Sequence, residues 1–226
     1  MISDLIEEFR DKIDLEHCFS HFSFEIAKNE ILDSKSNIIF LIGEPGSGKS
    51  FLLNYLYNKY PDKYILIKEP FLDKDEFLNG YDFENKKILI DEAQLLNFEM
   101  MEFLRILSDK GYQVIFAMHK SESRKVIDLP QFKSRYTQIV ELKALSYKEF
   151  EKYIYDKFIK HKGLFFLNNK TIKKIYIISK GNFRMSKKFV FTMLTLLNFS
   201  LKNNLSYNSL DNCIFEMTAI ELGFLK

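Results

Sequence analysis

The feature that most constrains this chain of 226 residues is the segment 43–50, which reads Gly-Glu-Pro-Gly-Ser-Gly-Lys-Ser. It matches the complete G-x-x-x-x-G-K-[ST] pattern of a phosphate-binding loop. The glycines permit a tight turn in which successive backbone N–H groups face an anion. Such a loop joins a β-strand to an α-helix, because the helix N-terminus adds positive potential beneath the phosphates. The pattern therefore predicts an α/β fold.

The flanking segments have the character that this loop requires. Residues 37–42 are a short apolar, β-branched run, and residues 51–60 carry apolar side chains at helical spacing. The alternative is a glycine-rich turn without a ligand, but a chance match has a probability on the order of one in a hundred. We expect ATP to contact the loop and the residue after it: Gly43, Glu44, Pro45, Gly46, Ser47, Gly48, Lys49, Ser50 and Phe51.

Two residues of the loop have separate expected roles. Lys49 is expected to reach the β- and γ-phosphates of the nucleotide. The Ser50 hydroxyl is expected to complete the coordination shell of Mg²⁺.

The order of the remaining segments predicts the fold in more detail. Apolar runs of strand length recur at residues 63–68, 87–91, 113–118 and 137–142, and helical patterns lie between them at 51–60, 71–79, 98–107 and, in broken form, 121–136. This alternation predicts a five-stranded parallel sheet with helices on both faces. Beyond the last strand, segments 146–160, 168–180, 184–199 and 206–222 fit amphipathic helices. We expect a nucleotide-binding core with N-terminal helices over residues 1–143 and a helical lid over 144–226.

Composition excludes several other classes of protein. Only Cys18 and Cys213 are present, so no disulfide framework is indicated. The acidic, amphipathic N-terminus is unlike a signal peptide. The most apolar stretch, 189–201, is too short to span a bilayer and contains Thr and Asn. These observations predict a cytoplasmic protein without a membrane span.

The charge is distributed unevenly along the chain. The formal net charge is only +2, but residues 143–190 contain thirteen Lys and Arg against three Asp and Glu. Such asymmetry is found on faces that bind nucleic acid, and here it would involve Lys173, Lys174, Lys187 and Lys188. Ordinary solvated helix faces are the other explanation, and the sequence leaves both open.

A second acidic motif follows the loop by about forty residues. Residues 88–94 read Ile-Leu-Ile-Asp-Glu-Ala-Gln, an apolar strand that ends in Asp91 and Glu92. Phosphoryl transfer needs a carboxylate on Mg²⁺ opposite the loop hydroxyl, and Asp91 is placed for this. Glu92 can orient or activate the attacking water. The alternative is that the two carboxylates cap the following helix.

Together, the phosphate loop, the strand ending in Asp-Glu-Ala and the helical C-terminal part resemble an AAA+ ATPase over nearly the whole chain. The resemblance implies a sensor at the end of the fourth strand. His119 occupies this place, where members of the family usually carry a small polar residue; a surface or strand-capping histidine is the alternative. It also implies an arginine finger at Arg135 that reaches the nucleotide of a neighbouring subunit, with Arg124 as the reserve candidate. Arg184 resembles the second sensor. The implied protein is a homo-oligomer whose site is completed between subunits.

Two branches of the family are suggested by shorter segments. Residues 91–94, 101–107 and 153–163 are similar to secretion-pathway ATPases of the ExeA type, which implies an ATPase that serves a secretion, pilus or DNA-uptake machine. Residues 129–135 resemble the DnaA group, which implies a DNA-binding accessory factor of replication or transposition. A nucleotide-gated interaction module with negligible turnover and a small-molecule kinase are further alternatives.

Overall fold

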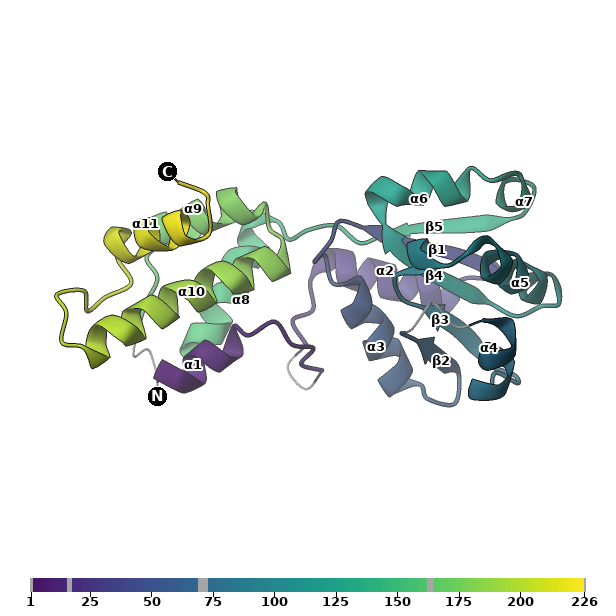
Figure 1. Cartoon of the computed structure of the whole chain (residues 1–226), viewed down its shortest axis with the longest axis horizontal. Helices are drawn as coiled ribbons and strands as arrows, with labels where there is room; N and C mark the ends of the chain where they lie inside the picture. Colours follow the sequence, from purple (N-terminus) through teal and green to yellow (C-terminus); the bar gives the residue numbers. More distant parts are fainter. Residues whose placement is uncertain (1, 16–17, 69–72, 162–164, 226) are drawn as a thin grey trace. The chain divides into compact units, whose positions relative to one another are not determined.

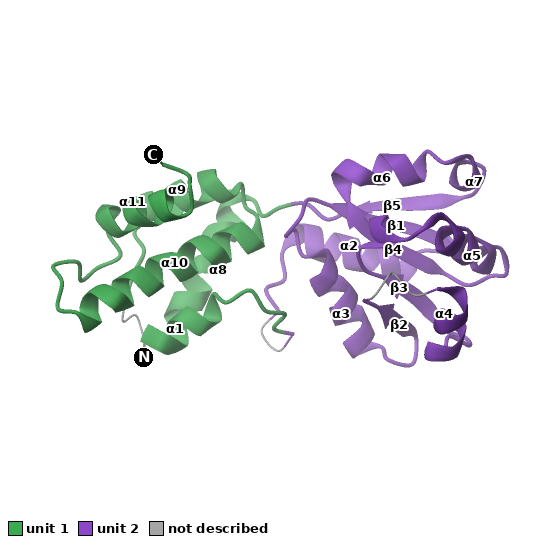
Figure 2. Cartoon of the chain, in the orientation of Figure 1, with its two compact units in different colours: residues 1–14, 144–226 green, residues 15–143 purple. Residues whose placement is uncertain are grey.

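A computed structural model describes residues 2–15, 18–68, 73–161 and 165–225 of the chain. The chain divides into two compact units (Figure 2). Residues 15–143 form the first, called here the α/β unit, and residues 1–14 with 144–226 form the second, called the helical unit.

The α/β unit is built on a five-stranded parallel sheet (Figure 1). Its order is β2-β3-β4-β1-β5. The strands are β1 (Ile38–Gly43), β2 (Tyr64–Ile67), β3 (Lys87–Ile90), β4 (Val114–His119) and β5 (Thr137–Glu141). Every residue of the interior strand β1, which lies between β4 and β5, is buried, as expected for a parallel strand that is covered on both faces. The predicted α/β phosphate-loop fold with five parallel strands is confirmed.

Helices cover both faces of this sheet. The helical elements of the unit are α2 (Phe22–Asp33), α3 (Lys49–Lys59), α4 (Lys74–Gly80), the short 3₁₀ helix η1 (Ala93–Leu95), α5 (Phe98–Asp109), α6 (Lys120–Ile127) and α7 (Pro130–Lys133). Residues 71 and 72, which belong to the helix expected over 71–79, lie outside the described residues. The broken helical pattern over 121–136 corresponds to two helices, because Pro130 starts the second one at its first position.

The side chains of β1 alternate between two apolar clusters. Phe40 belongs to the cluster that contains residues of α4, α5 and α7, and its ring lies 5.5 Å from that of Phe116 and 5.4 Å from that of Phe132. Leu41 belongs to the opposite cluster, with residues of α2 and α3. Because consecutive strand residues point to opposite faces, one apolar run supplies both layers.

The helical unit consists of five helices within the described residues. They are α1 (Ile2–Glu8), α8 (Tyr147–Ile159), α9 (Asn169–Ser179), α10 (Phe183–Lys202) and α11 (Asn212–Glu221). Gly181 joins α9 to α10 with φ 72°, and a Cβ atom there would lie 2.3 Å from the carbonyl oxygen of Leu145, so only glycine fits. No helix in the described parts of the chain is long and apolar enough to cross a membrane.

The N-terminal segment differs from the sequence expectation, which placed it with the nucleotide-binding core. Residues 1–14 belong to the helical unit. Phe9 is 1% exposed, and its ring lies 5.6 Å from that of Phe158 in α8. Glu8 accepts a hydrogen bond of 2.6 Å from the ammonium group of Lys157. An amphipathic pattern shows that one helix face is buried, but it does not show which partner buries it.

Candidate active site

The phosphate loop lies at the carboxyl edge of the sheet. β1 ends at Gly43 and α3 begins at Lys49, so the loop joins the centre of the sheet to a helix N-terminus. Gly46 (φ 78°) and Gly48 (φ 102°) are in the left-handed region, which favours glycine. The backbone therefore turns sharply at two of the loop glycines before the helix starts.

The first glycine of the loop is needed for a different reason. A Cβ atom on Gly43 would lie 2.6 Å from Ser47 Oγ and 2.7 Å from the carbonyl oxygen of Leu142. The loop is thus packed tightly against the end of β5. Ser47 Oγ is itself buried and has no hydrogen-bond partner among the described residues. A glycine cradle with an unsatisfied buried hydroxyl fits a phosphate group, since buried polar atoms are normally hydrogen-bonded.

Lys49 is held across this loop. Its side chain is buried (6% exposed), and Nζ donates hydrogen bonds to the carbonyl oxygens of Gly43 at 2.9 Å and Glu44 at 3.1 Å. Glu44 and Pro45 are exposed on the loop. Phe51, by contrast, packs at 5.8 Å from the ring of Phe24 in α2, so the structure gives it a packing contact.

The two residues expected to bind Mg²⁺ lie together. The Ser50 hydroxyl lies close to the carboxylate of Asp91, which directly follows β3. Burial raises the pKa of Asp91, and the nearby Ser50 hydroxyl and the hydrogen bond from the backbone N–H of Glu92 (3.0 Å) oppose that rise. A hydroxyl and a carboxylate side by side are oxygen ligands of the kind that Mg²⁺ prefers.

Glu92 and His119 also meet at this edge. Oε2 of Glu92 lies 3.4 Å from Nε2 of His119. His119 is the last residue of β4 and pairs in register with Gly43 of β1, so it lies on the strand next to the loop. Glu92 has a left-handed backbone (φ 49°, ψ 41°), which is uncommon for a residue other than glycine. Such conformations cluster at functional sites.

Sequence reasoning missed one partner of Glu92. The side-chain amide of Gln94 donates a hydrogen bond to Oε2 of Glu92. The sequence hint for this contact is that Gln94 lies two residues after Glu92, in the short segment that forms η1. The sequence does not reveal that this turn brings the two side chains together.

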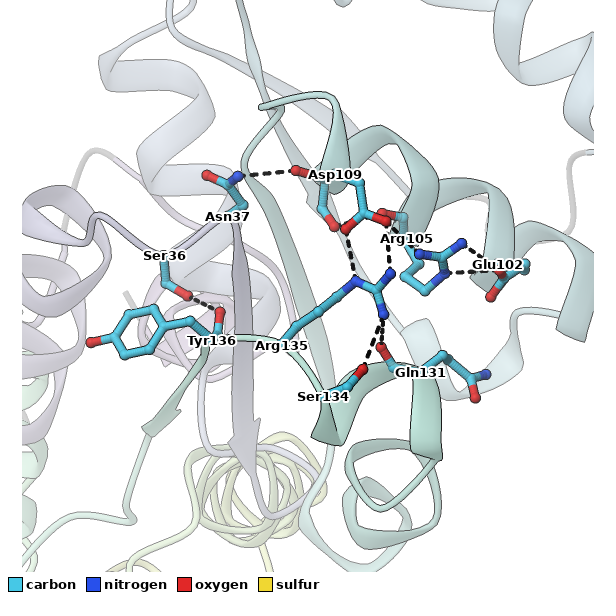
Figure 3. A network of polar contacts seen from close by, with 10 residues as sticks. Ser36, Asn37, Glu102, Arg105, Asp109, Gln131, Ser134, Arg135 and Tyr136 are labelled. Carbon is cyan, nitrogen blue, oxygen red and sulfur yellow. Dashed lines mark hydrogen bonds and ion pairs between the residues drawn. The ribbon is translucent and has the colours of Figure 1, made fainter.

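Arg135, the expected arginine finger, lies at the opposite edge of the sheet. It precedes the amino end of β5, whereas the phosphate loop follows the carboxyl end of β1. Its guanidinium contacts Asp109, the last residue of α5, and this pairing was not anticipated (Figure 3). The reserve candidate, Arg124, is exposed on α6. The structure therefore does not bring Arg135 together with the loop of its own α/β unit.

Arg184 belongs to the helical unit. It is the second residue of α10, and its Nε lies 3.3 Å from Oδ2 of Asp11 in an exposed ion pair. Its role as second sensor stays a prediction.

Comparison with known proteins gives the fold but no close relative. A family model described as RNA helicase matches residues 39–128, which is less than half of the chain. No curated protein sequence matches the chain. The finer assignment to the ExeA type therefore stays a prediction.

Several solved structures share the architecture. RuvB of Thermotoga maritima, a Holliday junction branch migration motor, matches with a TM-score of 0.63 and 18% identity over 88% of this chain. The Drosophila origin recognition complex (ORC) bound to DNA contains a chain that matches with a TM-score of 0.70 and 10% identity over 98%. Hsp104 with ATPγS and casein matches with a TM-score of 0.62 and 18% identity over 97%. This chain spans 66%, 65% and 45% of those chains. At such identities the likeness concerns the fold alone.

Proposed function

We propose that this protein binds ATP with Mg²⁺ at residues 43–50 and hydrolyses it. The observation that carries the proposal is the buried Ser47 hydroxyl in the glycine loop, which has no hydrogen-bond partner among the described residues. Ser50 and Asp91, the two expected ligands of the ion, lie close to each other beside it. The buried Lys49 ammonium and the glycine cradle at Gly43 support the same reading. When bound, Mg²⁺ neutralises charge that develops on the phosphate oxygens.

Separate residues of the chain bind the phosphates, activate the water and orient the general base. Lys49 and the backbone N–H groups of the loop bind the phosphates, and Lys49 stabilises the negative charge of the transition state. Glu92 orients the attacking water and accepts its proton. His119 and Gln94 both contact Oε2 of Glu92 and orient its carboxylate.

Two variants test this assignment. Glu92→Gln is expected to retain ATP binding and to lower kcat by about 10²–10⁴-fold, the usual contribution of a general base. Lys49→Ala is expected to lose ATP binding. Glu30→Gln, at an exposed glutamate of α2 outside the loop, serves as the control and keeps both properties. Turnover of Glu92→Gln at the wild-type rate would show that the mechanism is wrong. Binding without turnover in the wild-type protein at every concentration would favour a nucleotide-gated interaction module.

We also propose that the active form is a homo-oligomer in which Arg135 acts on the nucleotide of a second copy. The position of Arg135 at the amino edge supports this, since a side chain there is remote from its own phosphate loop. Arg184 is proposed to report the γ-phosphate to the helical unit. ATP turnover per subunit is therefore expected to rise with protein concentration, and Arg135→Ala is expected to remove that rise.

The process that the ATPase serves has two candidates. The segments that resemble ExeA-type ATPases support a role in a secretion, pilus or DNA-uptake machine. The likeness to a Holliday junction motor and to a DNA-bound complex supports an accessory factor that acts on DNA.

A structural observation favours the second candidate. Lys170, Lys173 and Lys174 are exposed on α9 and recur at helical spacing, although Lys174 is bonded to Asn212 at 2.5 Å. Lys187 differs from the sequence expectation: burial lowers its pKa, and it donates to the carbonyl oxygen of Lys12. The basic surface is therefore assigned to α9 rather than to Lys187.

A salt titration of DNA binding decides between the candidates. Lys170→Glu with Lys173→Glu is expected to weaken binding uniformly across sequences and to reduce its salt dependence. Lys202→Glu, an exposed charge at the end of α10, is the control. If the wild-type protein does not bind DNA at low salt, the DNA role is wrong. Capture of a pore or pilus component by Glu92→Gln in ATP would then support the secretion role.

A further inference from the structure

At the amino edge of the sheet, one carboxylate holds the expected arginine finger. Arg135 Nε lies 2.7 Å from Oδ1 of Asp109, and Nη2 lies 2.7 Å from Oδ2 (Figure 3). Two parallel N–H···O bonds of this kind match the planar fork of arginine to a carboxylate. A phosphate would have to accept hydrogen bonds from the same N–H groups of the guanidinium.

The third nitrogen of Arg135 is also engaged by its own subunit. Nη1 donates to the carbonyl oxygen of Gln131 and lies 3.4 Å from Ser134 Oγ. The guanidinium thus has every nitrogen directed at groups of the same α/β unit. To donate to a phosphate of another molecule, it has to leave Asp109.

The residues beside Arg135 and Asp109 are bonded through their carbonyl groups to one segment of the chain. Ser36, just before β1, donates from Oγ to the carbonyl oxygen of Tyr136 at 2.8 Å. Asn37 donates from Nδ2 to the carbonyl oxygen of Ser108 at 3.0 Å. The residues next to Arg135 and next to Asp109 are therefore both bonded to the segment that precedes β1.

The ion pair is nevertheless exposed enough for Arg135 to exchange Asp109 for another anionic partner. The side chains of Arg135 and Asp109 are 27% and 44% exposed, and exposed ion pairs contribute little net stability. Arg105 lies on the other side of Asp109, with Nη1 2.5 Å from Oδ2. Asp109 would thus keep a positive partner after Arg135 had left.

We propose that Asp109 is a latch for Arg135: it holds the guanidinium on its own subunit, and Arg135 acts on a second copy only after a nucleotide phosphate has replaced the Asp109 carboxylate. This inference rests on the proposed ATPase function. It makes Asp109 a positioning residue, because the carboxylate acts through Arg135. No covalent step is involved, since one anionic partner of the guanidinium replaces another.

The first test measures ATP turnover per subunit against protein concentration. Asp109→Asn keeps the shape of the side chain and removes its charge. It is expected to raise turnover roughly twofold to fivefold at concentrations below half-saturation, the range set by an exposed ion pair of ordinary strength. The gain is expected to vanish in Asp109→Asn with Arg135→Ala. Glu102→Gln removes the other carboxylate that pairs with Arg105 and leaves the Arg135 pair intact, so it is the matched control.

Unchanged or lower turnover of a folded Asp109→Asn protein would overturn the latch. A second measurement needs no variant at Asp109: the Nε–H resonance of Arg135 in the wild-type protein, assigned with Arg135→Lys. We expect this proton to be protected from exchange in the free subunit and to shift when ATPγS is added at assembling concentrations. An unchanged resonance in the assembled state would also overturn the inference.

The two proposals fail in distinguishable ways. If no turnover depends on Glu92, the ATPase proposal is wrong, whatever the Arg135 resonance does. If turnover depends on Glu92 but Arg135→Ala is as active as the wild-type protein, the ATPase proposal stands, and both the action of Arg135 on a second copy and the latch at Asp109 are wrong. If Arg135→Ala loses activity but Asp109→Asn is no more active than the wild-type protein, only the latch is wrong.

Discussion

Nε2 of His119 lies 3.4 Å from Oε2 of Glu92, although His119 ends β4 and Glu92 comes after β3. The strands β3 and β4 are neighbours, and their carboxyl ends lie beside the phosphate loop. His119 therefore lies where it can orient the carboxylate of Glu92, which we propose activates the attacking water.

We expect His119→Ala to lower kcat by up to about a hundredfold, the low end of what a general base supplies, because Glu92 loses an orienting partner. The KM for ATP is expected to change little, since Lys49 and the loop bind the phosphates. Steady-state kinetics with Lys120→Ala, an exposed neighbour, as control would check this. A change in KM alone would contradict the role.

Gly43→Ala is expected to weaken ATP binding and to lower the free energy of unfolding by about 1–3 kcal/mol, the usual cost of overpacking. The added Cβ would lie 2.7 Å from the carbonyl oxygen of Leu142, which cannot move without disturbing the end of β5. Gly80→Ala is the matched control, because nothing lies within 4 Å of its added Cβ. Urea unfolding and titration with a fluorescent ATP analogue provide the readouts. Equal behaviour of the two variants would show that the loop tolerates a side chain at Gly43.

Asp91→Asn is expected to increase the Mg²⁺ concentration for half-maximal turnover by about tenfold or more, because the ion loses a charged ligand. The same variant is expected to raise the Tm at pH 7. Burial raises the pKa of Asp91, so the folded state binds its proton more tightly than the unfolded state does, and the charged form costs stability at neutral pH. This gain in Tm is expected to shrink as the pH falls and Asp91 becomes protonated. Asp128→Asn, at an exposed carboxylate, should change neither property; a lower Tm for Asp91→Asn at pH 7 would contradict the sign.

Glu8→Gln is expected to destabilise the helical unit at neutral pH by about 1–3 kcal/mol, the range for a hydrogen bond to a charged group. Burial opposes ionisation of Glu8, but the hydrogen bond and charge of Lys157 hold its pKa below the ordinary value. The folded state therefore binds this proton less tightly than the unfolded state, and the stabilisation is complete above the unfolded pKa, about 4.3. We expect the difference between the wild-type and Glu8→Gln proteins to diminish as the pH falls below that value. Chemical denaturation at several pH values would measure it, with Glu7→Gln as an exposed control; a difference that grows on acidification would contradict the assignment.

The sequence alone was sufficient to predict the strands and helices, and those parts of the site that consist of residues close together in the chain. The strand before Gly43, the loop and the helix after it follow from adjacent residues, because strand and helix periods and glycine conformations are local properties. The run that ends in Asp91 and Glu92 was readable in the same way. Five apolar runs of strand length, alternating with helical patterns, were enough to predict the parallel sheet.

The tertiary structure decided which distant residues became partners. Phe9 packs on Phe158, and this contact assigns α1 to the helical unit, a choice that amphipathicity alone leaves open. Arg135 meets Asp109 across 26 positions of sequence, where α5 and β5 reach the same edge of the sheet. A local pattern specifies which face of an element is apolar or charged. Packing among elements far apart in the chain determines what that face contacts, and a local sequence pattern does not predict that partner.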